Sequence, residues 1–323
     1  MNYKFIDYPR FIPLSKYDLA LEKMVKKLEK RPEIKSIYQI GSISTPGISD
    51  IDLVAVFKNG KQCNFDPRSN ITDDEKYLFV HKLFGISESD FRESHRFTIF
   101  HNYKCLSGEE LIPSEHSENN AELTALRTQL ALEYLLKFYF NAFVESTYGI
   151  IKLRTLFLHV RALNYDLEFL QAPNSLLKES VDTLIEFRKN WFNKSITIQT
   201  ILKVRSTLFY HLDLFLQNTL SRVRFYTLDN PPIHLSKNMV LGNGIKLACF
   251  HKGIVLPHFS TFINRRYFNL NHRLNSFEFS VPITIATQNS FHMQRFDYLH
   301  QLAKSQQTNF PHFMALNPGL GAA

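Results

Sequence analysis

The first 115 residues alternate short apolar runs with turn signals. Apolar, β-branched runs at Ser36–Ile40 and Asp50–Phe57 predict strands of a buried sheet. Similar runs at Tyr77–Phe84 and Phe97–His101 predict two further strands. The segment Ser15–Asp18 has the pattern of a capping box, and helical spacing of apolar residues follows it until Pro32. This region therefore predicts a mixed sheet with flanking helices.

The middle of the chain has almost no glycine and a helical spacing of apolar residues. From about residue 121 to 222, leucine and phenylalanine recur every three or four positions, first between Leu123 and Phe138. The same spacing predicts helices near Ile150–Ala162, Leu176–Asn190 and Ile198–Leu220. We expect a helical domain here.

The pattern changes again after Arg224. Leu241–Ile245 has the composition of a hairpin turn between two apolar runs. Phe277–Ile285 alternates like a strand, Gln288–Lys304 predicts a last helix, and Asn317–Ala323 has the composition of a flexible tail. The expected fold class is α+β, with domains at residues 1–115, 116–222 and 223–323, the last a basic region of mixed helix and strand.

The composition is that of a soluble globular protein. The chain has 323 residues, of which 44% are hydrophobic and 21% charged. Three widely separated cysteines exclude a disulfide-built secreted fold, and the amino terminus shows no signal peptide. The most apolar stretch, residues 130–143, contains charged residues and is too short to span a bilayer. We therefore expect a cytoplasmic protein without membrane contact.

The net charge of +8 is unevenly distributed. Residues 1–148 contain 19 Lys and Arg against 21 Asp and Glu, and the remainder contains 19 against 9. A basic second half is typical of proteins with an anionic partner, such as RNA or a nucleotide, although a merely basic, solvated surface explains it as well.

Two carboxylates lie two residues apart at the start of a predicted strand. Because alternate residues of a strand face the same side, Asp50 and Asp52 project together while Ile51 and Leu53 enter the core. Unpaired carboxylates at this range repel each other, and a divalent cation removes the repulsion. Mg²⁺ prefers oxygen ligands and is usually held by one or two carboxylates plus substrate phosphates.

A Gly-Ser turn precedes this pair. Gly41 and Ser42 end the predicted strand before it, and a small-residue turn that leads into a helix presents backbone N–H groups to a phosphate. A phosphate-binding turn and metal-binding carboxylates are the components of phosphoryl or nucleotidyl transfer. A solvated strand end after an ordinary turn is the alternative.

The arrangement resembles the nucleotidyltransferase superfamily that includes DNA polymerase β. Its signature is an apolar strand, Gly-Ser, a spacer of about ten residues and Asp-apolar-Asp-apolar, matched here by Gly41, Ser42, Asp50 and Asp52. The resemblance implies that Gly41 and Ser42 contact the triphosphate of an NTP and that Asp50 and Asp52 are catalytic and hold Mg²⁺. The likeness covers residues 37–57, with a weaker continuation through residues 106–111.

The family pattern usually includes a third carboxylate on a neighbouring strand. The runs Tyr77–Phe84 and Arg96–His101 contain no Asp or Glu. His81 or His101 offers a base near neutral pH, and Lys82 offers a phosphate contact. A loop is the other source of the third carboxylate, and the candidates are Asp73, Asp74, Asp90 and Glu93.

We therefore expect a Mg²⁺-dependent nucleotidyltransferase that moves an NMP unit from an NTP to a hydroxyl acceptor and releases pyrophosphate. The basic half favours RNA, a nucleotide or a phosphorylated small molecule as the acceptor. The alternatives are a catalytically silent nucleotidyltransferase-like binding or regulatory protein, which a missing third carboxylate favours, and an RNA-binding protein that acts through its basic half.

Three weaker patterns complete the sequence. Cys249, His251 and His258 lack the spacing of a zinc site. Residues 262–269 combine arginine with aromatic residues, as in single-strand nucleic-acid binders, but a strand edge explains them better. Lys152, Arg154 and Arg161 are candidates for one basic helix face that lines the nucleotide site, or for a solvated face.

Overall fold

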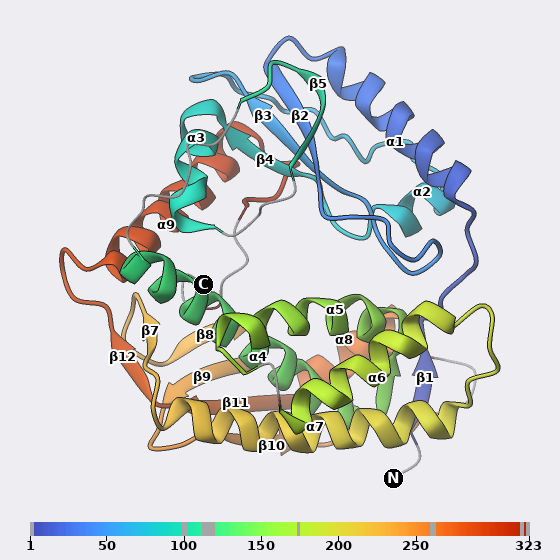
Figure 1. Cartoon of the computed structure of the whole chain (residues 1–323), viewed down its shortest axis with the longest axis vertical. Coiled ribbons are helices and arrows are strands. Elements are labelled where there is room, and N and C mark those ends of the chain that lie inside the picture. Colours follow the sequence, from blue (N-terminus) through green and yellow to red (C-terminus); the bar gives the residue numbers. More distant parts are fainter. Residues whose placement is uncertain are drawn as a thin grey trace. The chain divides into compact units, whose positions relative to one another are not determined.

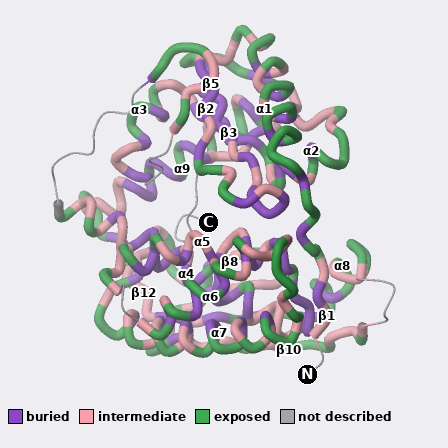
Figure 2. Tube along the Cα trace, turned by 45° about the vertical axis from the view of Figure 1, so that its right-hand side comes forward, coloured by how far each residue is buried: buried purple, intermediate pink, exposed green. Residues whose placement is uncertain are grey.

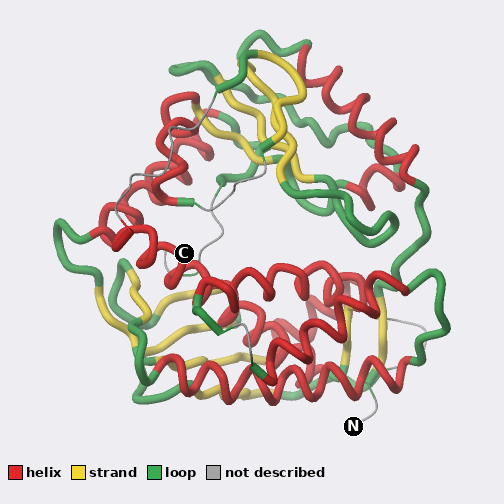
Figure 3. The backbone as a smooth tube through the Cα atoms, viewed as in Figure 1, coloured by secondary structure: helices red, strands yellow, loops and turns green. Residues whose placement is uncertain are grey.

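The chain folds into two compact units of mixed helix and strand. The computed structural model describes residues 3–98, 103–111, 120–172, 175–258, 263–316 and 320. The amino-terminal unit comprises Arg10–Leu126 and Gln294–Pro318, and the carboxy-terminal unit comprises Met1–Pro9, Arg127–Met293 and Gly319–Ala323. Figure 3 shows that each unit contains both helices and strands. The expected α+β fold class is confirmed, because the chain contains both helices and mixed sheets. The division into three domains stays a prediction.

The amino-terminal unit is built on a four-stranded mixed sheet. Its strands are ordered β4-β3-β2-β5, as Figure 1 labels them. Strands β3 and β4 are parallel, whereas β2 is antiparallel to both β3 and β5. The bounds are β2 Ile34–Ile40, β3 Asp52–Phe57, β4 Phe84–Ser87 and β5 Lys104–Gly108.

Helices and loops cover both faces of this sheet. The core on one face joins Tyr17 and Met24 of the first helix with Ile37, Leu53 and Phe57 of the sheet. On the other face Tyr38 stacks on Phe91 at a ring-centroid distance of 5.0 Å. Figure 2 shows the buried strands between the partly exposed helices. The helices are α1 Leu14–Glu29, α2 Asp73–Leu78, α3 Glu88–Phe97 and α9 Phe291–Asn309.

A segment from the end of the chain completes this core. Phe310 stacks on Phe57 at 4.2 Å, and Phe313 contacts the same ring edge-on at 5.1 Å. The amide of Gly85 in β4 donates to the carbonyl of Met314 at 2.8 Å. Sequence reasoning assigned these residues to the carboxy-terminal region, whereas they pack with the first sheet.

Two strand predictions and one cap prediction in this unit are wrong. Residues 77 and 78 end α2, because Thr72 and Glu75 form a capping box that starts a helix there, and only Phe84 begins a strand. Phe97 is the last residue of α3, and residues 99–101 lie outside the described part. Helix α1 begins at Leu14 after Pro13, so Ser15 lies inside the helix and is not its cap.

The predicted middle helices are confirmed in the carboxy-terminal unit. They are α4 Asn120–Tyr148, α5 Leu153–Phe169, α6 Leu176–Asn190 and α7 Ile198–Leu220. Their long apolar periodicity is matched by buried leucines such as Leu163, Leu184 and Leu212. Between α4 and α5, β6 Ile150–Lys152 pairs in parallel with β1 Lys4–Ile6.

Helix α4 packs on a second four-stranded sheet. Phe140 of α4 stacks on Phe279 at 4.1 Å, and Phe143 contacts Phe277. The strand order is β10-β11-β9-β8, and β7 pairs separately with β12. The bounds are β7 Phe225–Thr227, β8 Ile233–Ser236, β9 Met239–Asn243, β10 Ala248–Gly253, β11 Asn275–Val281 and β12 Ile283–Ile285.

The structure corrects two expectations for this sheet. The segment 241–245 is not a hairpin turn, because β9 and β10 both pair with β11 and not with each other. Residues 265–274 form helix α8 (Arg265–Leu274) and not a strand edge, with Asn264 as the N-cap. The expected strand 277–285 is present as β11 and β12, and the last predicted helix is α9. Residues 317–319 and 321–323 of the predicted tail lie outside the described part.

None of the helices in the described residues is long and apolar enough to cross a membrane.

Candidate functional site

The Gly-Ser turn and the carboxylates lie at one end of the β2–β3 pair. Antiparallel pairing places Ile40, the last residue of β2, opposite Asp52, the first residue of β3. Gly41 follows at φ +73°, a conformation that residues with a Cβ rarely adopt, and an added Cβ would meet no atom within 4 Å. Gly41 and Ser42 are both exposed, and they lie beside the first residue of β3.

The loop from residue 42 to 51 contains a tight turn and no helix. The amides of Ile48 and Ser49 donate to the carbonyl of Thr45 at 3.0 and 2.8 Å, which closes the turn at Pro46 and Gly47. The expected helix dipole behind the Gly-Ser turn is thus missing, because these hydrogen bonds fold the segment back on itself. Any phosphate contact here depends on backbone N–H groups and on a cation.

Two tyrosines from different helices hold this loop in place. Tyr17 of α1 is fully buried; its hydroxyl donates to the carbonyl of Ser49 at 2.7 Å and accepts from the amide of Gly47 at 2.9 Å. Tyr77 of α2 donates to the carbonyl of Gly47 at 2.6 Å. Sequence reasoning missed both residues, because it placed Tyr17 in a helix cap and Tyr77 in a strand.

Asp50 and Asp52 come together with His81. One ligand atom from each of the three residues lies within 4.8 Å of the others. His81 Nε2 is 2.7 Å from Asp52 Oδ1, and the side chains of His81 and Asp52 are 34% and 28% exposed. Ile51 and Leu53 are buried in the core as expected. The parallel pairing of β3 with β4 explains why they meet, because His81 lies three residues before β4, the strand that pairs with β3.

The charge of the carboxylates governs the state of His81. Burial opposes the charged imidazole, but the hydrogen bond and charge of Asp52, with a contribution from Asp50, raise the pKa of His81 to about 9. The imidazole is therefore protonated at neutral pH and forms an ion pair with Asp52. A role as general base, considered from the sequence, does not suit this state.

The other candidates for a third group are engaged elsewhere or lie outside the described residues. Lys82 Nζ donates to the carbonyl of Pro311 at 3.1 Å. Asp73 pairs with Lys76 at 2.9 Å, and Asp74 pairs with Arg10 at 3.5 Å. Asp90 accepts from the hydroxyl of Ser87 at 2.6 Å, Glu93 is not part of the cluster, and His101 is not described.

The donor set fits a divalent cation. Asp50 and Asp52 supply oxygen ligands, which suit Mg²⁺, and His81 supplies a nitrogen that suits Mn²⁺ or Zn²⁺ better. Partial exposure leaves room for water or a substrate phosphate in the remaining positions. The geometry admits a cation but does not select Mg²⁺ over the other metals.

The weaker sequence candidates do not add a second site. In the described part of the chain, Cys249, His251 and His258 form no cluster of metal-ligand atoms; His251 instead bonds Asn275 at 2.7 Å. Lys152 and Arg154 do not share a basic helix face, because Lys152 ends β6 and Arg154 is buried. Arg265 and Arg266 are exposed on α8, and residue 262 is not described.

No protein-family model matches the chain, and no curated protein matches it. The resemblance to the nucleotidyltransferase superfamily therefore rests on Gly41, Ser42, Asp50 and Asp52 and stays an expectation.

Proposed function

We propose that the amino-terminal unit binds an NTP with a divalent cation and transfers its NMP unit to a hydroxyl acceptor. The observation that carries the proposal is the cluster of Asp50, Asp52 and His81 beside the exposed Gly41-Ser42 turn. Phosphate oxygens and a divalent cation are the chemistry that such a combination recognises.

Each residue has a role in this proposal. Asp50 and Asp52 hold the cation, which neutralises charge on the phosphate oxygens when it is bound. The backbone N–H groups of Gly41 and Ser42 donate to the triphosphate, and Gly41 presents no Cβ to hinder its approach. Tyr17 and Tyr77 keep the intervening loop fixed, so that the carboxylates are in place before substrate binds.

The test is calorimetric titration of ATP, GTP, CTP and UTP into the full chain, with Mg²⁺, with Mn²⁺ and with EDTA. We expect one NTP to bind only with metal, and the Asp50→Asn/Asp52→Asn variant to lose the binding. The matched control is Asp73→Asn/Asp74→Asn, which removes two exposed carboxylates of α2 outside the cluster. Absence of metal-dependent binding for all four NTPs refutes the proposal.

The acceptor is then sought with α-labelled nucleotide. RNA, nucleotides and phosphorylated small molecules are offered in turn, and label transfer with release of pyrophosphate identifies the class. RNA is the first choice because of the basic second half of the chain.

A second candidate function is nucleotide binding without transfer. It is favoured by one observation: in the described residues the third member of the cluster is His81, which bonds Asp52, and not a carboxylate. The distinguishing result is metal-dependent NTP binding with no transfer to any acceptor in the wild type. The variant His81→Asp supplies a carboxylate at the same position, and transfer that appears only in this variant establishes the binding function.

A further inference from the structure

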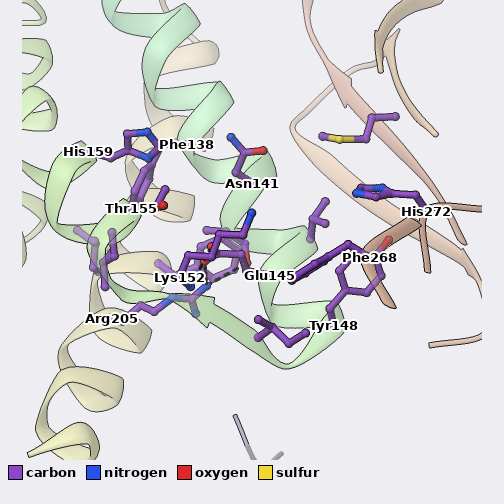
Figure 4. A pocket seen from close by; sticks show the side chains of 17 residues that line it. Phe138, Asn141, Glu145, Tyr148, Lys152, Thr155, His159, Arg205, Phe268 and His272 are labelled. Atoms are coloured by element: carbon purple, nitrogen blue, oxygen red, sulfur yellow. Dashed lines mark hydrogen bonds and ion pairs between the residues drawn. The ribbon is translucent and has the colours of Figure 1, made fainter. Parts of the chain in front are cut away.

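The carboxy-terminal unit contains a cavity of its own, far in sequence from the Asp50 cluster. Its volume is about 260 Å³, and its lining comes from α4, β6, α5, α7, β9 and α8 (Figure 4). Binding sites for drug-sized molecules occupy about 300–1,000 Å³, so this cavity suits a small ligand.

The walls are mostly apolar and partly aromatic. Phe138 of α4 and Phe268 of α8 contribute aromatic rings, and Leu156, Phe209 and Met239 supply further apolar surface. Figure 4 shows Phe138 and Phe268 entering the cavity region from different helices. Flat apolar groups gain both area burial and ring stacking in such surroundings.

The base of the cavity is a fixed ion pair. Arg205 is 4% exposed, and its Nη2 lies 3.2 Å from Glu145 Oε2 and 3.2 Å from the carbonyl of Ala142. Burial raises the pKa of Glu145, and the charge and hydrogen bond of Arg205 oppose this rise. The two opposite charges of the pair cancel each other. The pair is expected to stay formed, because the loss of either partner would leave an uncompensated buried charge.

Lys152 brings a positive charge to the cavity lining without forming an ion pair with a described carboxylate. Its side chain is exposed, and its Nζ lies 5.2 Å from the centre of the Phe268 ring. Within the described residues no carboxylate comes within 4.0 Å of Lys152 Nζ. Asp7 accepts a hydrogen bond of 3.4 Å from Thr155, and the charges of Arg154 and, to a smaller extent, Lys152 act on its carboxylate.

The two histidines of the cavity, His159 and His272, add no positive charge at neutral pH, because the pKa of each is lowered. Burial lowers the pKa of His159 to about 4, with a contribution from Lys137. Burial and the charge of Lys152 lower the pKa of His272. The cavity is therefore positive by about one charge at neutral pH, and it also offers the amide of Asn141, an exposed residue on its lining.

We propose that this cavity is a binding site for a small aromatic anion, a single planar ring that carries one carboxylate or phosphate. The ring packs against Phe268 and Phe138, and the anionic group pairs with Lys152. The amide of Asn141 bonds polar atoms at the edge of the ring. The inference stands independently of the proposed nucleotidyl transfer, because every residue that carries it belongs to the carboxy-terminal unit.

The test uses benzoate and phenyl phosphate as probes, and their binding to the full chain in EDTA is followed by calorimetry or ligand-observed NMR. Benzyl alcohol, which has a ring without charge, and inorganic phosphate, which has charge without a ring, are the comparison probes. We expect at least one aromatic anion to bind, and to bind at least tenfold more tightly than either comparison probe.

Three variants locate the site. Lys152→Met should weaken binding of the aromatic anion about tenfold, whereas Lys246→Met, at an exposed lysine of the same unit that does not line the cavity, should leave it unchanged. Phe268→Leu keeps an apolar side chain but removes the ring, and should weaken binding as well. Asp50→Asn/Asp52→Asn should have no effect. The proposal is overturned if Lys152→Met, with unchanged circular dichroism, binds the aromatic anion as tightly as the wild type does. It is also overturned if inorganic phosphate binds as tightly as the aromatic anions, or if no aromatic anion binds.

Discussion

The hydroxyl of Tyr17 is expected to hold the loop that presents Asp50. It is fully buried, and it bonds both the carbonyl of Ser49 and the amide of Gly47. Tyr17→Phe removes only this oxygen and leaves two buried backbone groups without that partner. A buried polar group that loses its partner costs about 1–3 kcal/mol, so loss of the partner of both groups should destabilise the loop by about 2–6 kcal/mol.

The measurement is native-state hydrogen exchange at residues 47–51. In the wild type the amides of Ile48 and Ser49 donate to the carbonyl of Thr45, and the amide of Ile51 donates to the carbonyl of Leu78. A destabilisation of about 2 kcal/mol lowers protection roughly 30-fold where exchange occurs by local opening. The same variant should weaken metal-dependent NTP binding, because Asp50 directly follows the loop.

The matched control is Tyr210→Phe. Tyr210 is 61% exposed on α7, so loss of its hydroxyl should change stability by less than about 0.5 kcal/mol. The reasoning is refuted if Tyr17→Phe lowers protection at residues 47–51 by less than threefold, or if protection falls equally throughout the amino-terminal unit, since the second result would mean global unfolding and not loss of a local clamp.

Three further predictions concern backbone, core and pH. Gly108→Ala should prevent folding of the amino-terminal unit, because φ is +88° and the new Cβ would lie 2.1 Å from the carbonyl oxygen of residue 35. The control Gly60→Ala, at φ +69° in open space, should lower the free energy of unfolding in urea by only about 1 kcal/mol. Phe57→Ala and Phe310→Ala should each lower the free energy of unfolding by about 3–5 kcal/mol. A double-mutant cycle should show a coupling of about 0.5–1.5 kcal/mol, because the two rings stack at 4.2 Å, and additive effects would disprove the contact. His159→Phe should make the stability of the protein less sensitive to acid. The pKa of His159 in the folded state is about 4, below the usual 6.5, so the wild type loses up to roughly 3 kcal/mol of stability as pH falls from 6.5 to 4. An identical pH dependence of chemical unfolding in the variant would contradict this.

Local patterns predicted the parts of the fold that are local. Helices α6 and α7 were predicted at their observed bounds, because each repeats its apolar spacing over many turns, whereas α5 starts three residues later and ends seven residues later than predicted. The error at Tyr77–Phe84 was also local, and Thr72 with Glu75, three residues apart, was the capping signal that identifies α2. The same reading of Ser87 and Asp90 finds the start of α3.

The remaining features depend on contacts between distant parts of the sequence. Phe310 and Phe313 complete the first sheet, and no periodicity around them tells on which core they pack. The apparent hairpin at residues 241–245 failed for the same reason, since β11, more than thirty residues later, inserts between β9 and β10.

The same distinction between local patterns and long-range pairing applies to the residues of the candidate site. Asp50 and Asp52 were predictable because strand alternation alone puts them on one face, and the spacing to Gly41 follows from one antiparallel pairing. His81 was one of several candidates, and only the parallel pairing of β4 with β3 selects it. That selection changes the chemistry expected of the site: a protonated imidazole bonded to Asp52 must give up its proton or move before it ligates a cation. Cation choice and activity in the variant His81→Asp therefore carry more information than any further substitution at the two carboxylates.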